Sequence, residues 1–227
     1  MLTVKTDQRG KKMRRRKTGM GVLLILVIIC GLSGCGQGKA PEVSSVSIEK
    51  DGKIIHQIVG EFEQNYYEKD GLASLAEERV AEYCADNGAD SVALEEINEE
   101  EGKVVIRFRY ATDRDYSAFN NRELFIGTLE EAEEKGYNLG YVAFISARSQ
   151  PMEISDIEEP EKKRIAIIGM KPAEEMQVNI YGKVLYVNQS AASDLDVTIS
   201  GKSGVSISYP AMDSGAQESV LSYIIFE

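Results

Sequence analysis

Two turn signals separate alternating hydrophobic segments in the first half of the chain. Asp51-Gly52 lies between segments 46–50 and 53–59, and an Asp-Gly pair between alternating apolar residues is a strong β-hairpin signal. Segments 92–97 and 103–110 form a second pair, joined by an acidic stretch that contains a glycine. Alternation places four apolar side chains on one face of segment 103–110: Val104, Ile106, Phe108 and Tyr110. The pattern predicts two antiparallel hairpins.

Helical spacing replaces alternation between these hairpins. Apolar residues recur every three or four positions at Leu72, Leu75, Ala76, Val80, Tyr83 and Cys84. Asp70 is the predicted N-cap of this helix, and Gly88 is its predicted C-terminal stop. Thr128 and Glu131 have the spacing of a capping box, which predicts a second, short helix that ends at Gly136.

Segment 137–147 is predicted to be a further strand, and no amphipathic helix is evident after Lys163. Six short β-branched segments follow, separated by turn residues: 164–169, 176–180, 183–187, 195–200, 205–209 and 220–226. This spacing predicts a small sandwich or barrel-like segment. The expected fold class is α+β, an antiparallel sheet with one main packed helix followed by this small all-β segment.

The N-terminus combines positive charge with a short apolar run. Lys and Arg residues gather in segment 11–17, and segment 21–32 is uncharged. Twelve helical residues reach about 18 Å, well short of a bilayer core of about 30 Å, so an export signal is favoured over a membrane span. Leu32-Ser33-Gly34-Cys35 then resembles the lipobox of bacterial lipoproteins. The resemblance implies that Cys35 receives a diacylglyceryl group and becomes the first mature residue. Met1 and Met13 are both candidate starts, because most of the charge cluster lies after Met13.

Five segments follow from these patterns. Residues 1–34 are the expected lipoprotein signal peptide, and residues 35–45 are a small, polar tether. Residues 46–149 are the expected α+β domain, and residues 164–227 are the expected β-rich domain. The acidic segment 150–163, with two prolines, is the expected linker. The β-rich domain would be marginally stable alone, so we expect it to dock on the first domain.

The expected mature chain is strongly acidic. Eight of the 26 basic residues and one of the 37 acidic residues precede Cys35, which leaves 18 basic and 36 acidic residues and a formal charge of −18. Such a surface repels nucleic acid and anionic headgroups, so no nucleic-acid partner is expected. The predicted location is the extracytoplasmic face of the bacterial cell membrane, with the diacylglyceryl anchor holding the protein there.

Cysteine use leaves no intramolecular disulfide. Cys30 leaves with the signal peptide and Cys35 is acylated, so Cys84 remains as a single thiol. Core packing on the apolar helix face is favoured over a reactive or intermolecularly paired thiol.

The chain also resembles a group of uncharacterised lipoproteins from Gram-positive anaerobes. Three segments carry this resemblance: Tyr66-Tyr67, Asp115 to Thr128, and Tyr223-Ile224-Ile225-Phe226. It covers most of residues 46–147 and, more loosely, the β-rich tail, and it implies no activity.

Several possible chemical motifs are incomplete. Ser200-Gly201-Lys202-Ser203 lacks the first glycine of a phosphate-binding loop, because Asp196 stands there. His56 is the single histidine and is predicted to be an ordinary strand residue rather than a catalytic one. The acidic runs in segments 95–101, 130–134 and 156–161 lack the spacing of a calcium-binding loop. Paired carboxylates could serve a glycosidase, but the chain has no Trp, the residue on which sugars usually stack. No enzyme activity, metal or cofactor is expected.

Two hypotheses for function remain. The first is an interaction module that presents sheet edges and loops to an envelope protein or to the wall. The alternative is a small-molecule or cation-binding lipoprotein with a pocket between the two domains that is lined by aromatic residues. Its candidate lining residues are Tyr66, Tyr67, Tyr110, Tyr116 and Phe119.

Overall fold

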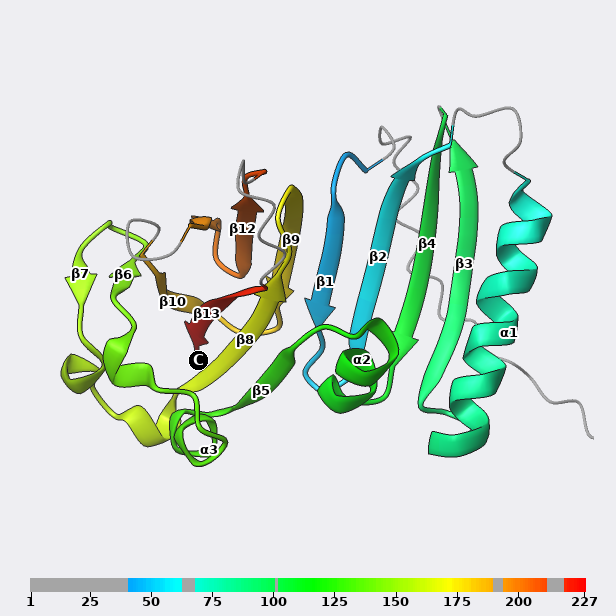
Figure 1. The fold of residues 1–227 in the computed structure, drawn as a ribbon. Coiled ribbons are helices and arrows are strands. Elements are labelled where there is room, and N and C mark those ends of the chain that lie inside the picture. The colour runs from blue at the N-terminus through cyan, green and yellow to red at the C-terminus, as the bar shows by residue number, and fades with distance from the viewer. Residues whose placement is uncertain (1–40, 63–67, 101, 190–193, 212–218) are drawn as a thin grey trace, which may run out of the picture. The chain divides into compact units, whose positions relative to one another are not determined.

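The computed structural model describes residues 41–62, 68–100, 102–189, 194–211 and 219–227, which belong to one compact unit. These residues form a mixed α+β fold with two sheets (Figure 1). Sheet A has the spatial order β11 (Asp196–Ser200), β12 (Gly204–Tyr209), β9 (Glu174–Ile180), β1 (Ser44–Ile48), β2 (Ile54–Glu61), β4 (Lys103–Tyr110) and β3 (Val92–Glu100). Sheet B has the order β5 (Leu124–Thr128), β8 (Arg164–Met170), β13 (Val220–Phe226), β10 (Val184–Asn188), β6 (Phe144–Ser146) and β7 (Pro151–Met152). The expected α+β class is confirmed.

Among the described strand pairs, β1–β9 is parallel and the others are antiparallel. Both predicted hairpins form, β1 with β2 and β3 with β4. Six strands occur where the β-rich pattern predicted them after Lys163, namely β8 to β13.

The strands on either side of the expected linker at 150–163 share both sheets. β9 pairs with β1 in sheet A, and β8 pairs with β5 in sheet B. The division into separate domains 46–149 and 164–227 is therefore corrected, because either half alone would leave backbone hydrogen-bonding groups of these strands unpaired. The expected linker also packs on the fold, since Ile157 between the 3₁₀ helices η2 (Ile154–Asp156) and η3 (Pro160–Lys162) is buried.

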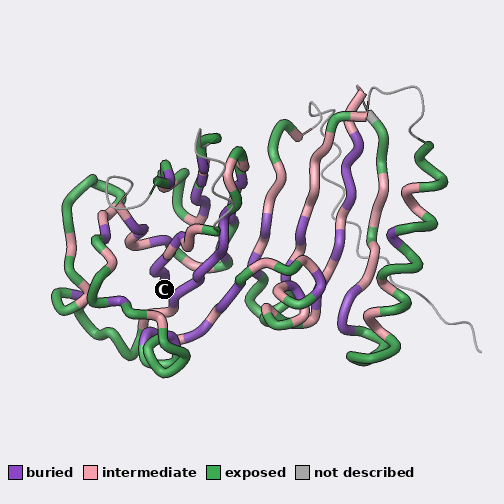
Figure 2. Tube along the Cα trace, in the orientation of Figure 1, coloured by how far each residue is buried: buried purple, intermediate pink, exposed green. Residues whose placement is uncertain are grey.

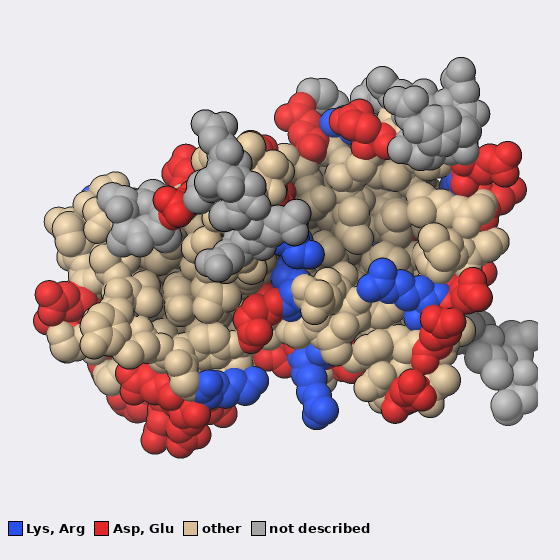
Figure 3. All heavy atoms as spheres, viewed as in Figure 1, with Lys and Arg blue, Asp and Glu red and all other residues tan. Residues whose placement is uncertain are grey.

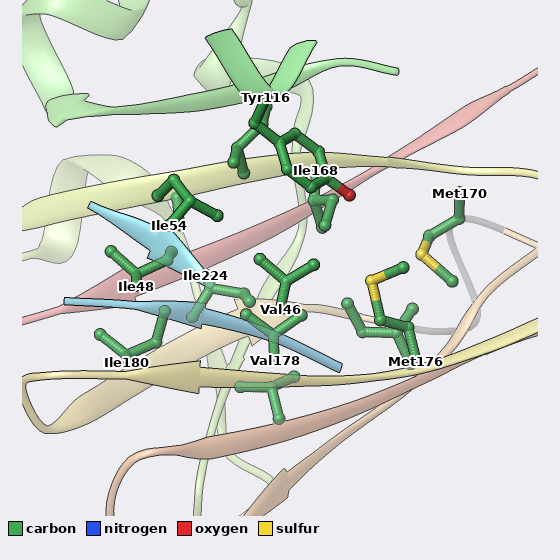
Figure 4. Close-up of a cluster of buried hydrophobic side chains, with 14 of the residues drawn as sticks. Val46, Ile48, Ile54, Tyr116, Ile168, Met170, Met176, Val178, Ile180 and Ile224 are labelled. Carbon is green, nitrogen blue, oxygen red and sulfur yellow. The ribbon is translucent and has the colours of Figure 1, made fainter. Parts of the chain in front are cut away.

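A hydrophobic core lies between the sheets. Val46 of β1 and Val178 of β9 belong to the same buried cluster as Ile168 of β8 and Ile224 of β13. Figure 4 shows these side chains meeting from the two sheets. A second buried cluster covers the other face of sheet B and includes Ile167. Both faces of β8 are therefore buried, which explains its nearly continuous apolar sequence (Figure 2).

Three helices complete the unit: α1 (Lys69–Asn87), α2 (Asp113–Asn120) and α3 (Leu129–Glu134). α1 packs beside β3 and is mostly exposed (Figure 2). Gly88 ends it as predicted, with φ of 110°. Asp70 is not the N-cap, because the N-cap is Glu68, two residues earlier. Asp70 lies in the first turn, where its negative charge interacts favourably with the helix dipole.

Of two further predictions, the short helix α3 is confirmed and the strand at 137–147 is wrong. α3 has the predicted capping box of Thr128 and Glu131. Segment 137–147 is not one strand, because the 3₁₀ helix η1 (Leu139–Tyr141) buries Leu139 and leaves only the short β6 extended.

Replacing Ile168, which is 1% exposed, by Ala tests the shared core. We expect the free energy of unfolding to fall by about 2–5 kcal/mol, through lost burial and a residual cavity. Ile55→Ala, at a half-buried position of β2, is the matched control with a smaller loss. Urea unfolding followed by circular dichroism should show one transition in all three proteins; two separate transitions would contradict the shared core.

Candidate functional site: a basic hollow

The end of sheet B where β5 and β13 begin and β8 ends carries an open hollow of about 630 Å³. Arg122, Lys135 and Lys171 lie in its wall. They come from three connections: the one from α2 to β5, the one after α3, and the one from β8 to β9. Figure 3 shows Lys and Arg side chains in the middle part of one face, with acidic side chains beside them and larger acidic clusters toward the margins. A concentration of positive charge is notable in a chain with 37 acidic and 26 basic residues.

The end of α2 places Arg122. Asn121 caps the helix in the left-handed conformation with φ of 47°, and the N–H groups of Asn121 and Arg122 both donate to the Ser117 carbonyl. Arg122 is then bound by an ion pair from its Nη2 to Glu174 at the start of β9. Its side chain is only 10% exposed, so this wall of the hollow is fixed in position.

Glu174 also binds the backbone of Lys171, a second basic residue of the hollow. Its Oε2 accepts a hydrogen bond from the Lys171 N–H at 3.0 Å. One carboxylate therefore orders both Arg122, from before the expected linker, and Lys171, from after it. The Lys171 side chain is exposed and free to reach a ligand.

The third wall is set by the end of α3. The Gly136 N–H donates to the Glu133 carbonyl and the Tyr137 N–H to the Ala132 carbonyl, at 2.9 and 3.1 Å. Gly136 has φ of 93°, as expected for the glycine of such a helix stop. The turn places the Lys135 Nζ 4.7 Å from the centre of the Phe125 ring and turns Tyr137 into the hollow.

One carboxylate lines the hollow among these basic groups. The Tyr137 hydroxyl donates a hydrogen bond to Glu123 Oε1, and the Glu123 carbonyl accepts from the Gly169 N–H at 2.9 Å. Burial and the Glu123 carboxylate raise the pKa of Tyr137, so the phenol stays protonated as a donor. A Cβ on Gly169 would lie 2.9 Å from the Ser219 hydroxyl, so glycine permits the close approach of β8 to this wall.

His56 is a buried residue of β2 and does not line the hollow. It is 6% exposed, and its ring contacts the Tyr116 ring at 5.2 Å between centroids. Burial, with a smaller effect of the Arg122 charge, lowers the pKa of His56 from 6.5 to about 3. The histidine is therefore neutral at physiological pH, and the described lining of the hollow contains no histidine or cysteine.

The aromatic residues proposed for a pocket lie in the core instead. Tyr110 and Tyr116 are 0% exposed and Phe119 is 5% exposed, and their rings stack edge-on against one another. This corrects their assignment as pocket residues. Tyr66 and Tyr67 lie outside the described residues, as does the predicted lipidation site Cys35.

The other sequence candidates have structural roles. The half-buried Cys84 packs against the core, and its Sγ donates to the Val92 carbonyl at 3.2 Å. Gly201 forms the turn of the β11–β12 hairpin, with φ of 68°. Glu95 and Glu96 form ion pairs with Arg109 and Arg107. Within the described ranges, no group of three His, Cys, Asp or Glu side chains is placed to hold a metal ion.

Side chains of α2 already bind the outer edge of β5. This edge is therefore not available for the interaction-module hypothesis, in which the protein presents sheet edges to a partner. Ser117 Oγ accepts from the Leu124 N–H at 2.9 Å, and Asp113 Oδ2 accepts from the Ile126 N–H at 2.9 Å. Side chains of α2 thus satisfy the donors that an added strand would need at this edge.

No protein-family model, curated protein or solved structure matches this chain. The helices of the described part include none that is both long and apolar enough to cross a membrane.

The single histidine gives a direct test of the burial of His56 in β2. We expect the His56 ring signals in NMR to stay at neutral-imidazole shifts from pH 7 down to about pH 4.5, because the folded pKa is about 3. A titration midpoint near 6.5 would contradict the burial.

The same shift predicts a stability effect with a defined sign. Between pH 6.5 and about 3 the unfolded chain binds a proton at His56 that the folded chain does not, so stability falls as pH decreases through this window. At pH 4 the loss from this residue is on the order of 3 kcal/mol. His56→Leu should therefore lose less stability than the natural chain between pH 7 and pH 4, whereas equal losses would contradict the prediction.

Proposed function

We propose that the chain is an extracytoplasmic lipoprotein, anchored to the cell membrane by a diacylglyceryl group on Cys35, that acts as a binding protein for a ligand with a carboxylate or similar oxyanion. The observation that carries the proposal is the hollow, where Arg122, Lys135 and Lys171 meet in an otherwise acidic chain. Lys and Arg are the usual partners of such anions, and a volume of about 630 Å³ is within the range of small-ligand sites.

In this proposal the acyl anchor attaches the protein to the membrane and the hollow binds the ligand. The lipobox at Leu32 to Cys35 supports attachment at the membrane, and the acidic surface explains why an acyl anchor is needed for it. Binding rather than catalysis is proposed because His56, the single histidine, is buried and neutral and does not line the hollow. The two hypotheses from the sequence meet at this site, since a ligand with a carboxylate can be a small molecule or part of an envelope partner.

The ligand-binding proposal predicts a dependence on ligand charge. We expect the full chain, purified in detergent, to bind N-acetylglycylglycine at least about tenfold more tightly than N-acetylglycylglycinamide, which lacks the carboxylate. Isothermal titration or NMR titration measures both affinities. Equal affinity for the two peptides, or binding of neither, would overturn the proposal.

A charge reversal locates this binding at the hollow. Lys135→Glu combined with Lys171→Glu should remove the preference for the charged peptide, because two exposed cations are replaced by anions. The control is Lys50→Glu with Lys202→Glu, the same change of charge in two hairpin turns away from the hollow. Loss of binding in both double variants would indicate a general charge effect rather than this site.

The anchor is tested separately by Cys35→Ser. We expect the natural chain to sediment with bacterial membranes and the variant to lose the acyl group, because serine has no thiol to acylate. Mass spectrometry of the mature protein should show the diacylglyceryl mass on Cys35 alone. An unmodified Cys35 in the mature protein would refute the anchoring mechanism.

A further inference from the structure

The hollow has a negative group fixed among its positive ones. Glu123 lies in the same lining as Lys135 and Lys171. Tyr137 holds its carboxylate by a hydrogen bond, and the backbone of Gly169 holds its carbonyl at 2.9 Å. The carboxylate is therefore part of the built wall of the site.

A simple anion does not match such a wall. A compact dianion would be attracted by the lysines but repelled by Glu123, whose charge its own partner Tyr137 does not neutralise. A ligand with an anionic and a cationic group can satisfy both. Asn121 and Ser219 also line the hollow, and their neutral polar side chains can hydrogen-bond to amides.

We infer that the hollow binds a small zwitterion, a free amino acid or short peptide, with its carboxylate at Lys135 and Lys171 and its ammonium group at Glu123. The inference rests on the proposed function and adds the second recognition group. Glu123 then acts as the specificity residue that selects ligands with a free amino group. The volume of about 630 Å³ accommodates a ligand of this size.

Three peptides that differ only at their termini test the inference. Glycylglycine carries both charges, N-acetylglycylglycine carries only the carboxylate, and glycylglycinamide carries only the ammonium group. We expect the full chain to bind glycylglycine about tenfold more tightly than N-acetylglycylglycine. The difference in affinity between glycylglycine and glycylglycinamide should be larger than tenfold. Equal or weaker binding of glycylglycine would overturn the inference.

The variant Glu123→Gln tests whether Glu123 causes the preference for glycylglycine over N-acetylglycylglycine. Glu123→Gln keeps an oxygen that can accept from Tyr137 and removes only the charge, so the preference for glycylglycine should fall to about one while N-acetylglycylglycine binds as well or better. Glu49→Gln, in the turn between β1 and β2, is the control that keeps the preference. Thermal unfolding of each variant checks that the fold is retained.

The outcomes separate this inference from the proposed function. A persistent tenfold preference in Glu123→Gln would overturn the role of Glu123. Binding of both carboxylate peptides without preference, abolished by the double lysine variant, would overturn the zwitterion inference and leave the anion-binding proposal in place. If no peptide binds, both are wrong.

Discussion

The parallel pairing of β1 with β9 is the constraint on which the rest of the structure depends. It joins Ser44–Ile48 to residues 176–180, from opposite parts of the chain, and places β1 in the interior of sheet A. The inward residues Val46 and Val178 then pack against sheet B (Figure 4). Because backbone hydrogen bonds and core contacts both cross between the two halves, neither half has a complete sheet or core by itself.

The residue that begins β9 also fixes part of the hollow. Glu174 begins β9, and its carboxylate binds the Arg122 guanidinium and the Lys171 backbone. A mostly buried ion pair stabilises little by itself, but losing one partner leaves an unpaired charge, so Glu174 is expected to fix the geometry more than the stability. Arg122 is thus a rigid wall, and the exposed Lys135 and Lys171 supply mobile charges that can adapt to a ligand.

The sequence predicts local structure well where the local pattern decides it. The Asp51-Gly52 turn, the capping box at Thr128 and the six strands after Lys163 all follow from spacing and turn residues, and all occur. α2 escaped prediction because it is only eight residues long, although Thr112 and Asp115 carry its capping signal. The break expected at 150–163 was wrong because acidic residues and prolines mark a surface segment, and Ile157 still anchors that segment in the core.

The hollow could not be predicted from the sequence for a related reason. Arg122, Lys135 and Lys171 are separated along the chain and carry no motif, and only the pairing of β8 with β5 and β13 brings their connections together. His56 shows the reverse case, since a single histidine attracts attention in sequence yet its place on the inner face of β2 makes it a neutral core residue.

The most direct test is a map of backbone amide shifts in the full chain during a titration with glycylglycine. We expect the perturbed amides to cluster at four separate places in the chain, residues 121–123, 135–137, 171 and 219–221, because the fold brings them to one hollow. Perturbations confined to one of these segments, located elsewhere, or absent at saturating peptide would contradict it.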